Sequence, residues 1–257
     1  MRILITNDDG IHAHGLKVLE NIARQLSDDV FVVAPETDQS GVSHSLSLND
    51  PLRLRKISHH HYAVKGTPTD CVIMAMRHVL VDRKPDLILS GINRGQNAAE
   101  DVTYSGTIAA AMEGAILGVP SIAFSQAYVS GAHDDIPWQC GMHHGASIIK
   151  RILELGIPKN TLINVNFPAC APEDVRGIAV CSQGQRNQEW YKLDERKDGR
   201  GNSYFWVAFT REEYARPVGT DLAALADQRI AITPLKLDLT DYPTMTEFAA
   251  LFDDIKL

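Results

Sequence analysis

The chain begins Met1-Arg2-Ile3-Leu4-Ile5-Thr6-Asn7-Asp8-Asp9-Gly10, and this stretch decides its fold. The run from Ile3 to Thr6 is short and has no polar face, which is typical of a strand buried in a parallel sheet. Open α/β sheets bind their ligands beyond the carboxyl ends of the strands. We therefore expect Asp8 and Asp9 to lie where a substrate docks.

Two adjacent carboxylates at such an edge need either a proton or a cation nearby. Residues 7–14 contain no Lys or Arg, so a divalent metal ion is the simplest counter-charge. Oxygen ligands favour a hard ion, Mg²⁺ or Mn²⁺, and do not separate the two. Taken alone, the stretch is equally typical of an Asp-Gly turn that begins the next helix.

The composition limits the partners of the chain. Its 257 residues carry 25 Lys plus Arg against 32 Asp plus Glu, a formal net charge of -7, so the broad basic surface of a nucleic-acid binder is absent. No apolar stretch approaches the roughly 20 residues that span a bilayer, and the first residues do not form a secretory signal. The four cysteines lack CxxC spacing. We expect reduced thiols, a cytoplasmic location, and neither a membrane nor a nucleic-acid partner.

Strand and helix patterns alternate through the first two thirds of the chain. Apolar runs predict strands at 30–34, 86–90, 119–125 and 162–166, and shorter strands at 52–57 and 62–65. Helical spacing covers 16–26, 71–80, 108–117 and 141–155. This order predicts an α/β fold with a Rossmann-like, doubly wound, mainly parallel sheet in three layers. Residues 1–168 are expected to form this catalytic core.

The pattern changes beyond residue 168. Strands are predicted at 178–182, 204–210 and 229–234, with a polar stretch at 183–202 and a helix at 245–254. We interpret 169–257 as a β-hairpin-rich extension, an oligomerisation arm with Trp190, Tyr191 and Trp206 available for contacts. A local subdomain folded onto its own chain is the alternative.

Four oxygen-bearing residues come at or shortly after the ends of candidate strands: Asp8, Asp9, Ser40 and Asn93. Together they would form an incomplete octahedral shell for one Mg²⁺ or Mn²⁺, with positions left for water and a substrate oxygen.

A phosphate site is predicted beside them. Ser105-Gly106-Thr107 opens an Ala-rich helix, whose free N–H groups and dipole suit an anion. Gly41, Asn97 and Ser105 are candidates for further substrate contacts.

The chain resembles a known family, the SurE survival-protein 5'-nucleotidases. The motifs that carry the resemblance are Ile3 to Gly10, Val33-Ala34-Pro35 with Gln39-Ser40-Gly41, Gly66-Thr67-Pro68-Thr69-Asp70-Cys71, Ser90-Gly91-Ile92-Asn93, Tyr104 to Gly114 and, more weakly, Ile230 to Leu235. The resemblance implies a Rossmann-like metal-dependent phosphomonoesterase that acts on nucleoside 5'-monophosphates. It also implies a single divalent ion held by Asp8, Asp9, Ser40 and Asn93, and an exchanged carboxy-terminal arm that builds homodimers or homotetramers. His14, where Pro is expected, and Gln39, where Arg is frequent, leave the substrate preference in doubt.

The expected reaction is attack by water on phosphorus, with Asp8 or Asp9 orienting or deprotonating the water. A covalent aspartyl-phosphate through Asp8 is the rival route, although the haloacid-dehalogenase phosphatases that use it have Asp-x-Asp spacing. A non-catalytic nucleotide-binding regulatory module is the alternative function. A dinucleotide-dependent oxidoreductase is disfavoured because G-x-G-x-x-G is missing after the first strand. The preferred base, 3'-esters and short polyphosphate stay open.

Overall fold

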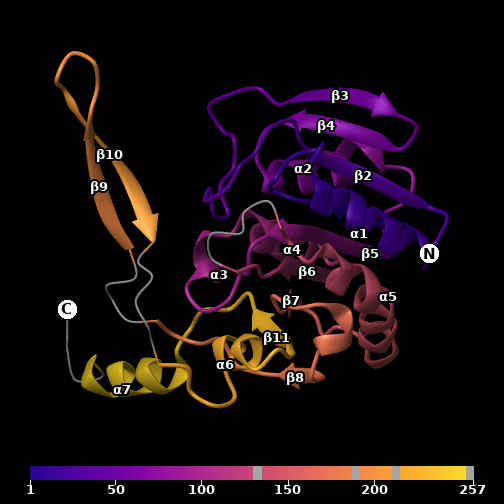
Figure 1. The fold of residues 1–257 in the computed structure, drawn as a ribbon. Helices are drawn as coiled ribbons and strands as arrows, with labels where there is room; N and C mark the ends of the chain where they lie inside the picture. The colour runs from indigo at the N-terminus through magenta and orange to yellow at the C-terminus, as the bar shows by residue number, and fades with distance from the viewer. Residues whose placement is uncertain (130–134, 187–190, 210–214, 253–257) are drawn as a thin grey trace.

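The computed structural model describes residues 1–129, 135–186, 191–209 and 215–252 (Figure 1). Within these ranges no helix combines the length and apolar character that crossing a membrane requires. The elements in chain order are β1 (Ile3–Thr6), α1 (His14–Arg24), β2 (Val30–Pro35), β3 (Arg53–Ser58), β4 (His61–Lys65), α2 (Pro68–Met74), the π-helical turn η1 (Ala75–Val79), β5 (Leu87–Arg94), α3 (Asp101–Tyr104), α4 (Gly106–Ile116), β6 (Ser121–Gln126), α5 (Trp138–Leu155), β7 (Thr161–Phe167), the 3₁₀ turn η2 (Pro172–Asp174), β8 (Ile178–Val180), β9 (Tyr191–Lys197), β10 (Ser203–Phe209), α6 (Asp221–Ala226), β11 (Ile230–Lys236) and α7 (Tyr242–Phe252).

One large sheet carries the site. Its strands lie in the order β3-β4-β2-β1-β5-β6-β7-β11-β8, and the run from β4 to β7 is parallel. The chain leaves β1 toward β2 on one side and later places β5 on the other side of β1. Ligands of open α/β sheets bind where the direction of winding reverses in this way. The carboxyl ends of β1 and β5 therefore form the expected crevice, and the predicted α/β fold is confirmed.

Helices cover both faces of the sheet, because the side chains of β1 alternate between two cores. Ile3 and Ile5 face the core under α1 and α5, whereas Leu4 faces the core under α2, η1 and α4. Figure 1 shows these helices on either side of the strands. β1 is thus a fully buried strand, and the residues that follow it stand on a rigid support.

β5 runs further than the sequence indicates. A strand is predicted at 86–90, but β5 continues to Arg94. Ser90 pairs with Ala123 and Asn93 pairs with Ser125, so two residues of β5, Gly91 and Ile92, oppose the single residue Phe124 of β6, and β5 contains a bulge. Bulges re-aim the side chain that follows them. Gly91 fits here because a Cβ at this position would lie 2.2 Å from the Phe124 carbonyl oxygen.

The carboxy-terminal region is shared between the sheet and an excursion from it. β11 pairs antiparallel with β7, and β8 pairs parallel with β11, so the sheet continues past the predicted boundary at residue 168. β9 and β10 form a separate two-stranded hairpin that projects from the body, with α7 near its base (Figure 1). Of the aromatic residues predicted to be exposed there, Trp206 is exposed, and Trp190 lies outside the described residues.

Candidate functional site

Asp8 is the most buried carboxylate of the predicted site, with 4% of its surface exposed. It follows β1 directly and accepts a hydrogen bond from the Thr107 hydroxyl at the start of α4. A Cβ on Gly106 would lie 2.8 Å from the Asp8 Cβ, so only glycine lets the helix approach this closely. Burial first, and then the charge of Asp9, raise the pKa of Asp8 to about 7, although the bond from Thr107 opposes the shift.

Asp9 is half-buried and faces β5. Its Oδ2 accepts a hydrogen bond of 3.1 Å from the Arg94 main-chain nitrogen. Burial raises the pKa of Asp9, the charge of Asp38 raises it further, and the contacts with Arg94 oppose both effects. Three carboxyl groups, Asp8, Asp9 and Asp38, therefore share one small region with little positive charge from the protein.

The loop after β2 brings Ser40 to this region. The Gln39 main-chain nitrogen donates a 2.8 Å hydrogen bond to the Asp8 carbonyl oxygen. Asp38 then holds Ser40, accepting bonds of 2.6 Å from its hydroxyl and 2.7 Å from its main-chain nitrogen. Ser40 and Gly41 are both exposed on the loop. Nothing in the sequence pattern singled out Asp38, although it lies two residues before a predicted ligand.

Asn93 completes the predicted metal set. Its Nδ2 donates a 2.8 Å hydrogen bond to the Gly95 carbonyl oxygen, which leaves Oδ1 as the end able to contact a cation. The residue before Asp8, Asn7, has its Oδ1 buried without a hydrogen-bond partner. Carboxylate, amide and hydroxyl oxygens next to an unsatisfied acceptor fit a hard divalent cation. Among the described residues no cluster of three or more His, Cys, Asp or Glu has metal-binding geometry, and this set contains only two carboxylates from that group.

The amino terminus of α4 faces the same carboxylates. Ser105 caps the helix, and its hydroxyl oxygen accepts a 3.1 Å bond from the Ile108 main-chain nitrogen. Gly106 and Thr107 follow as the first helical residues, beside Asp8. A helix terminus with its N–H groups directed here favours a phosphate. The predicted residues Ser105, Gly106 and Thr107 are thus brought together with Asp8.

Asn97 lies in a buried polar network. Its Nδ2 donates to the Ser125 hydroxyl at 2.8 Å, and its main-chain nitrogen donates to Asn166 Oδ1 at 2.8 Å. Asn164 and Asn166 in turn donate to its carbonyl oxygen. These contacts fix the backbone that connects Asn93 to α4. The sequence carried a signal for them, because Asn164 and Asn166 alternate with apolar residues in a buried strand.

A second buried carboxylate anchors the loop of Ser40. Asp70 accepts hydrogen bonds of 2.7 Å from the Ser47 hydroxyl, 3.2 Å from the Ser47 nitrogen and 2.8 Å from the Thr67 nitrogen. Further along the same loop, His44 Nε2 lies 3.1 Å from Glu113 Oε2 of α4. The loop is therefore tied to both α2 and α4.

This fold and site define a class: α/β proteins that present paired carboxylates and a helix amino terminus at the switch point of a parallel sheet, an arrangement suited to a phosphate group. Within that class, the chain belongs to the SurE family, whose description is Survival protein SurE and whose pattern matches residues 3–190. The family resemblance seen in the sequence is confirmed.

Individual relatives extend the match over almost the whole chain. A protein of Methylobacterium sp. (strain 4-46) called 5'-nucleotidase SurE is 68% identical over 249 residues, which cover 97% of this chain and 98% of the relative. A protein of the same name from Methylobacterium nodulans is 67% identical over 252 residues, with 98% and 100% covered. The crystal structure of the SurE protein from Aquifex aeolicus superposes with a TM-score of 0.84 at 41% identity and covers 98% of this chain and 99% of that one.

Proposed function

We propose that this chain hydrolyses nucleoside 5'-monophosphates to nucleoside and phosphate with the help of one divalent metal ion, Mg²⁺ or Mn²⁺. The observation that carries the proposal is the buried Asp8 carboxyl, placed beside a second carboxylate and against the amino terminus of α4. Two anions beside a phosphate site would repel the substrate unless a cation lay between them. The name 5'-nucleotidase, borne by a relative that is 68% identical, supports the same activity.

In this proposal Asp8, Asp9, Ser40 and Asn93 hold the metal ion. The bound ion would lower the pKa of a water molecule and neutralise charge on the phosphoryl oxygens. The main-chain N–H groups at the start of α4 orient the phosphate, which favours in-line attack on phosphorus. Asp8 or Asp9 accepts the proton of the attacking water.

The α4 terminus contributes the remaining contacts. Ser105, Gly106 and Thr107 are proposed to bind the phosphate, with Gly41 at the exposed side of the site and Asn97 holding the connecting loop in place. Because Gly106 carries no side chain, the start of α4 can lie against Asp8, which keeps the proposed phosphate site next to the carboxylates.

Phosphate release from 5'-AMP by the purified protein tests the proposal. Release is expected with Mn²⁺ or Mg²⁺, no release is expected with a chelator, and Asp9→Ala should abolish both metal binding and turnover without unfolding the protein. Asp50→Ala, at an exposed position in the loop after β2, is the matched control and should keep full activity. 3'-AMP, short polyphosphate and an aryl phosphate complete the substrate panel. Absence of release from every substrate with either metal would move the assignment to a nucleotide-binding module.

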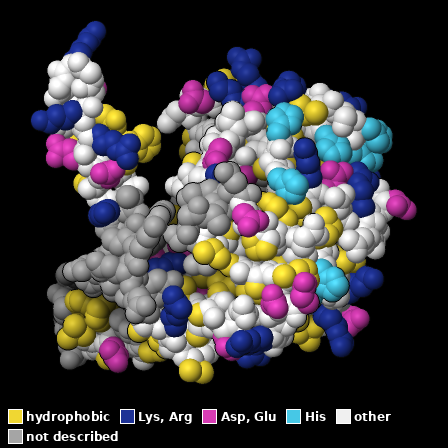
Figure 2. All heavy atoms as spheres, in the orientation of Figure 1, with side chains coloured by type: hydrophobic (Ala, Val, Ile, Leu, Met, Phe, Trp, Pro, Cys, Tyr) yellow, Lys and Arg dark blue, Asp and Glu magenta, His cyan; other side chains and the backbone are white. Residues whose placement is uncertain are grey.

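We further propose that the chain assembles as a homodimer or homotetramer through an arm within residues 169–257, made of β9, β10 and α7. The hairpin exposes Leu193, Trp206 and Val207, and α7 exposes Met245 and Phe248. Figure 2 shows the hairpin standing apart from the body, with apolar side chains among charged ones. An isolated two-stranded hairpin is at best marginally stable in water, so an apolar one needs a partner surface.

Sedimentation velocity tests the assembly. A mass of two or four chains is expected for the wild type, and a smaller mass for a variant that carries Leu193→Ser and Trp206→Ser. A monomeric wild type would contradict the proposal.

A cytoplasmic location is also proposed, since all four cysteines are buried free thiols.

A further inference from the structure

The chain turns sharply at residues 98–101, just before α3 and the proposed phosphate site. The Asp101 main-chain nitrogen donates a 3.2 Å hydrogen bond to the Ala98 carbonyl oxygen and so closes the turn. Within it, Ala99 is fully buried and has a φ angle of 54°. A residue with a Cβ rarely adopts this left-handed conformation, which persists only where the surrounding structure holds it. The contacts of the turn must therefore supply that support.

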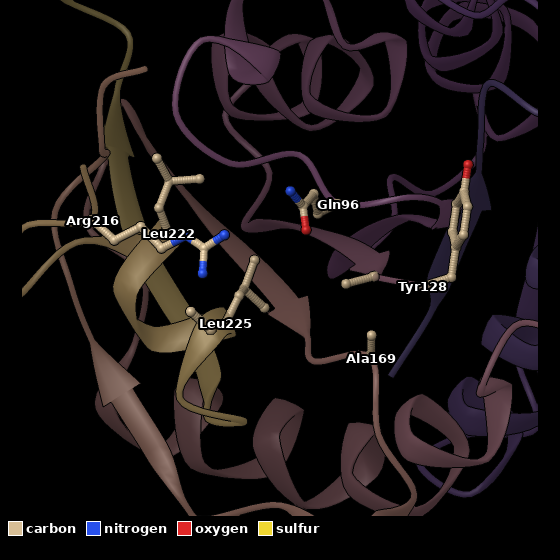
Figure 3. A pocket seen from close by; sticks show the side chains of 8 residues that line it. Gln96, Tyr128, Ala169, Arg216, Leu222 and Leu225 are labelled. Carbon is tan, nitrogen blue, oxygen red and sulfur yellow. The ribbon is translucent and has the colours of Figure 1, made fainter. Parts of the chain in front are cut away.

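Asp221, the first residue of α6, supplies one part of the support. It is fully buried, and its carboxylate accepts hydrogen bonds of 2.9 Å from the Ala99 nitrogen and 2.8 Å from the Gly184 nitrogen. Leu222, the next residue, lies in one apolar cluster with Ala99. It also lines a cavity together with Gln96, which comes shortly before the turn (Figure 3). The turn is thus attached to two segments of the carboxy-terminal region.

Arg186 supplies the other part, and its side chain is buried, with 8% exposed. Its two terminal nitrogens donate hydrogen bonds of 3.0 and 2.8 Å to the two carboxylate oxygens of Asp101. Its main-chain nitrogen donates to the Glu100 carboxylate at 2.9 Å, and its Nη1 donates to the Ala98 carbonyl oxygen at 3.1 Å. A planar guanidinium group that is paired with both oxygens of a carboxylate fixes the orientation of both groups, which a lysine cannot do. Arg186 therefore holds the turn and the first residue of α3 in one geometry.

Only one turn of helix separates the Arg186–Asp101 pair from the phosphate site. α3 contains four residues, and the Asp101 carbonyl oxygen accepts a 3.0 Å hydrogen bond from the Ser105 nitrogen. Ser105 is also the cap of α4, where its carbonyl oxygen accepts a 3.1 Å bond from the Ala109 nitrogen. A shift of Asp101 is therefore passed on to the first N–H groups of α4. Displacements of about 1 Å can lower turnover about 100-fold.

We propose that Arg186 is a positioning residue of the phosphate site. Through Asp101 it fixes α3, and through Ser105 it fixes the amino terminus of α4 against Asp8. The inference rests on the proposed function, because it explains what holds the phosphate-binding groups of that site. Arg186 lies shortly before β9 in the chain, and Figure 1 shows α3 on the side of the body that faces the hairpin. The segment that leads into the arm thus also holds the site in place.

Titration calorimetry of the full-length protein separates the two halves of the site. Inorganic phosphate, added in the presence of Mn²⁺, reports on the start of α4, and Mn²⁺ alone reports on the carboxylates after β1. Arg186→Gln should raise the Kd for phosphate about tenfold or more and lower kcat/KM for 5'-AMP by about 10- to 100-fold, while the Kd for Mn²⁺ stays within about twofold. Arg186→Lys keeps the charge but loses the paired hydrogen bonds, so it should show a smaller effect of the same kind.

A second variant keeps the test independent of whether Arg186→Gln folds. Asp101→Asn replaces one oxygen that faces Arg186 by a donor group, so it should weaken phosphate binding by a similar factor. Because both changes act on one pair, the double variant should bind phosphate no more weakly than the weaker single variant. Arg176→Gln is the matched control, because Arg176 forms an exposed ion pair of 3.6 Å with Asp227. It should match the wild type in every titration.

An unchanged Kd for phosphate in folded Asp101→Asn and in a folded Arg186 variant would overturn the inference. An equal loss of phosphate and Mn²⁺ binding would overturn it too, because it indicates general damage to the fold. If the wild type turned over no substrate, the proposed function would fail, but the phosphate titration would still decide this inference. Weaker phosphate binding in the variants than in the wild type supports the positioning role, and equal binding, or no binding by any form, refutes it.

Discussion

Replacement of Asp8 by Asn tests the electrostatics at the carboxyl end of β1. Burial and the charge of Asp9 raise the pKa of the Asp8 carboxyl from 3.8 to about 7 in the folded protein. A carboxyl with a raised pKa stabilises the fold below its unfolded pKa and loses that contribution as the pH rises through the folded pKa. Without metal, the wild type should therefore lose stability between about pH 4 and pH 7, and Asp8→Asn should lose less because its amide does not ionise.

The size of this loss of stability follows from the shift in the pKa of Asp8. About three pKa units at about 1.4 kcal/mol each give a total near 4 kcal/mol. Part of this is already lost at pH 5, because the unfolded carboxyl is ionised there, and about 3 kcal/mol remains to be lost between pH 5 and pH 8. The variant also changes the hydrogen bonds to α4, but that effect is the same at both pH values and cancels in the comparison.

Urea unfolding in the presence of a chelator, at pH 5 and pH 8 and at one protein concentration, measures this difference. The free energy of unfolding of Asp8→Asn relative to the wild type should rise by about 3 kcal/mol from pH 5 to pH 8. Asp50→Asn, at an exposed carboxyl, should show no such rise. An equal pH dependence of wild type and Asp8→Asn would refute the reasoning.

Three further predictions concern the same site. Gly106→Ala should lower kcat about 100-fold and the free energy of unfolding by about 1–3 kcal/mol, because its Cβ would lie 2.8 Å from that of Asp8. Steady-state kinetics and urea unfolding measure the two effects. Gly199→Ala is the control and should be neutral, because a Cβ there would have nothing within 4 Å. Asp70→Asn should destabilise the fold by about 2 kcal/mol and raise KM, since the Ser47 hydroxyl loses its charged hydrogen-bond acceptor. Hydrogen exchange across residues 36–50 should become faster. Unchanged exchange there would contradict the anchoring role of Asp70. Removal of divalent metal should lower the unfolding free energy by about 2.7 kcal/mol relative to protein at a metal concentration of 100 Kd, as thermal unfolding with and without chelator would show.

The sequence predicted the parts of the fold that have a local signal. Ile3 to Thr6 is apolar on both faces and is followed by Gly10, so both the buried strand and its exit could be read directly. The placement of Asp8, Asp9 and Asn93 at one edge followed from the rule that parallel strands end together. The start of a helix at Ser105 to Thr107 followed from the Ala-rich helical run that comes after them, whereas the capping hydrogen bond of Ser105 is a finding of the structure.

Features that depend on distant pairing could not be read in the same way. The bulge in β5 arises from its register with β6, and the Gly91 stretch by itself is equally typical of a loop. β11 joins the main sheet through antiparallel pairing with β7, which no residue pattern within either strand reveals. Asp70 and Glu113 meet their partners only after the loop of Ser40 folds over α2 and α4.

The pairing of β11 with β7 also has a consequence for synthesis of the chain. The proposed metal ligands and the start of α4 are all made by Thr107, and β7 is complete at Phe167, but β11 begins only at Ile230. At about 5–20 residues per second, roughly 3 to 12 s separate the two strands at the ribosome. During that interval the nascent sheet presents the bare hydrogen-bonding edge of β7, a template for pairing with another chain. β11 thus covers the exposed edge of β7, and it is synthesised well after the proposed catalytic residues.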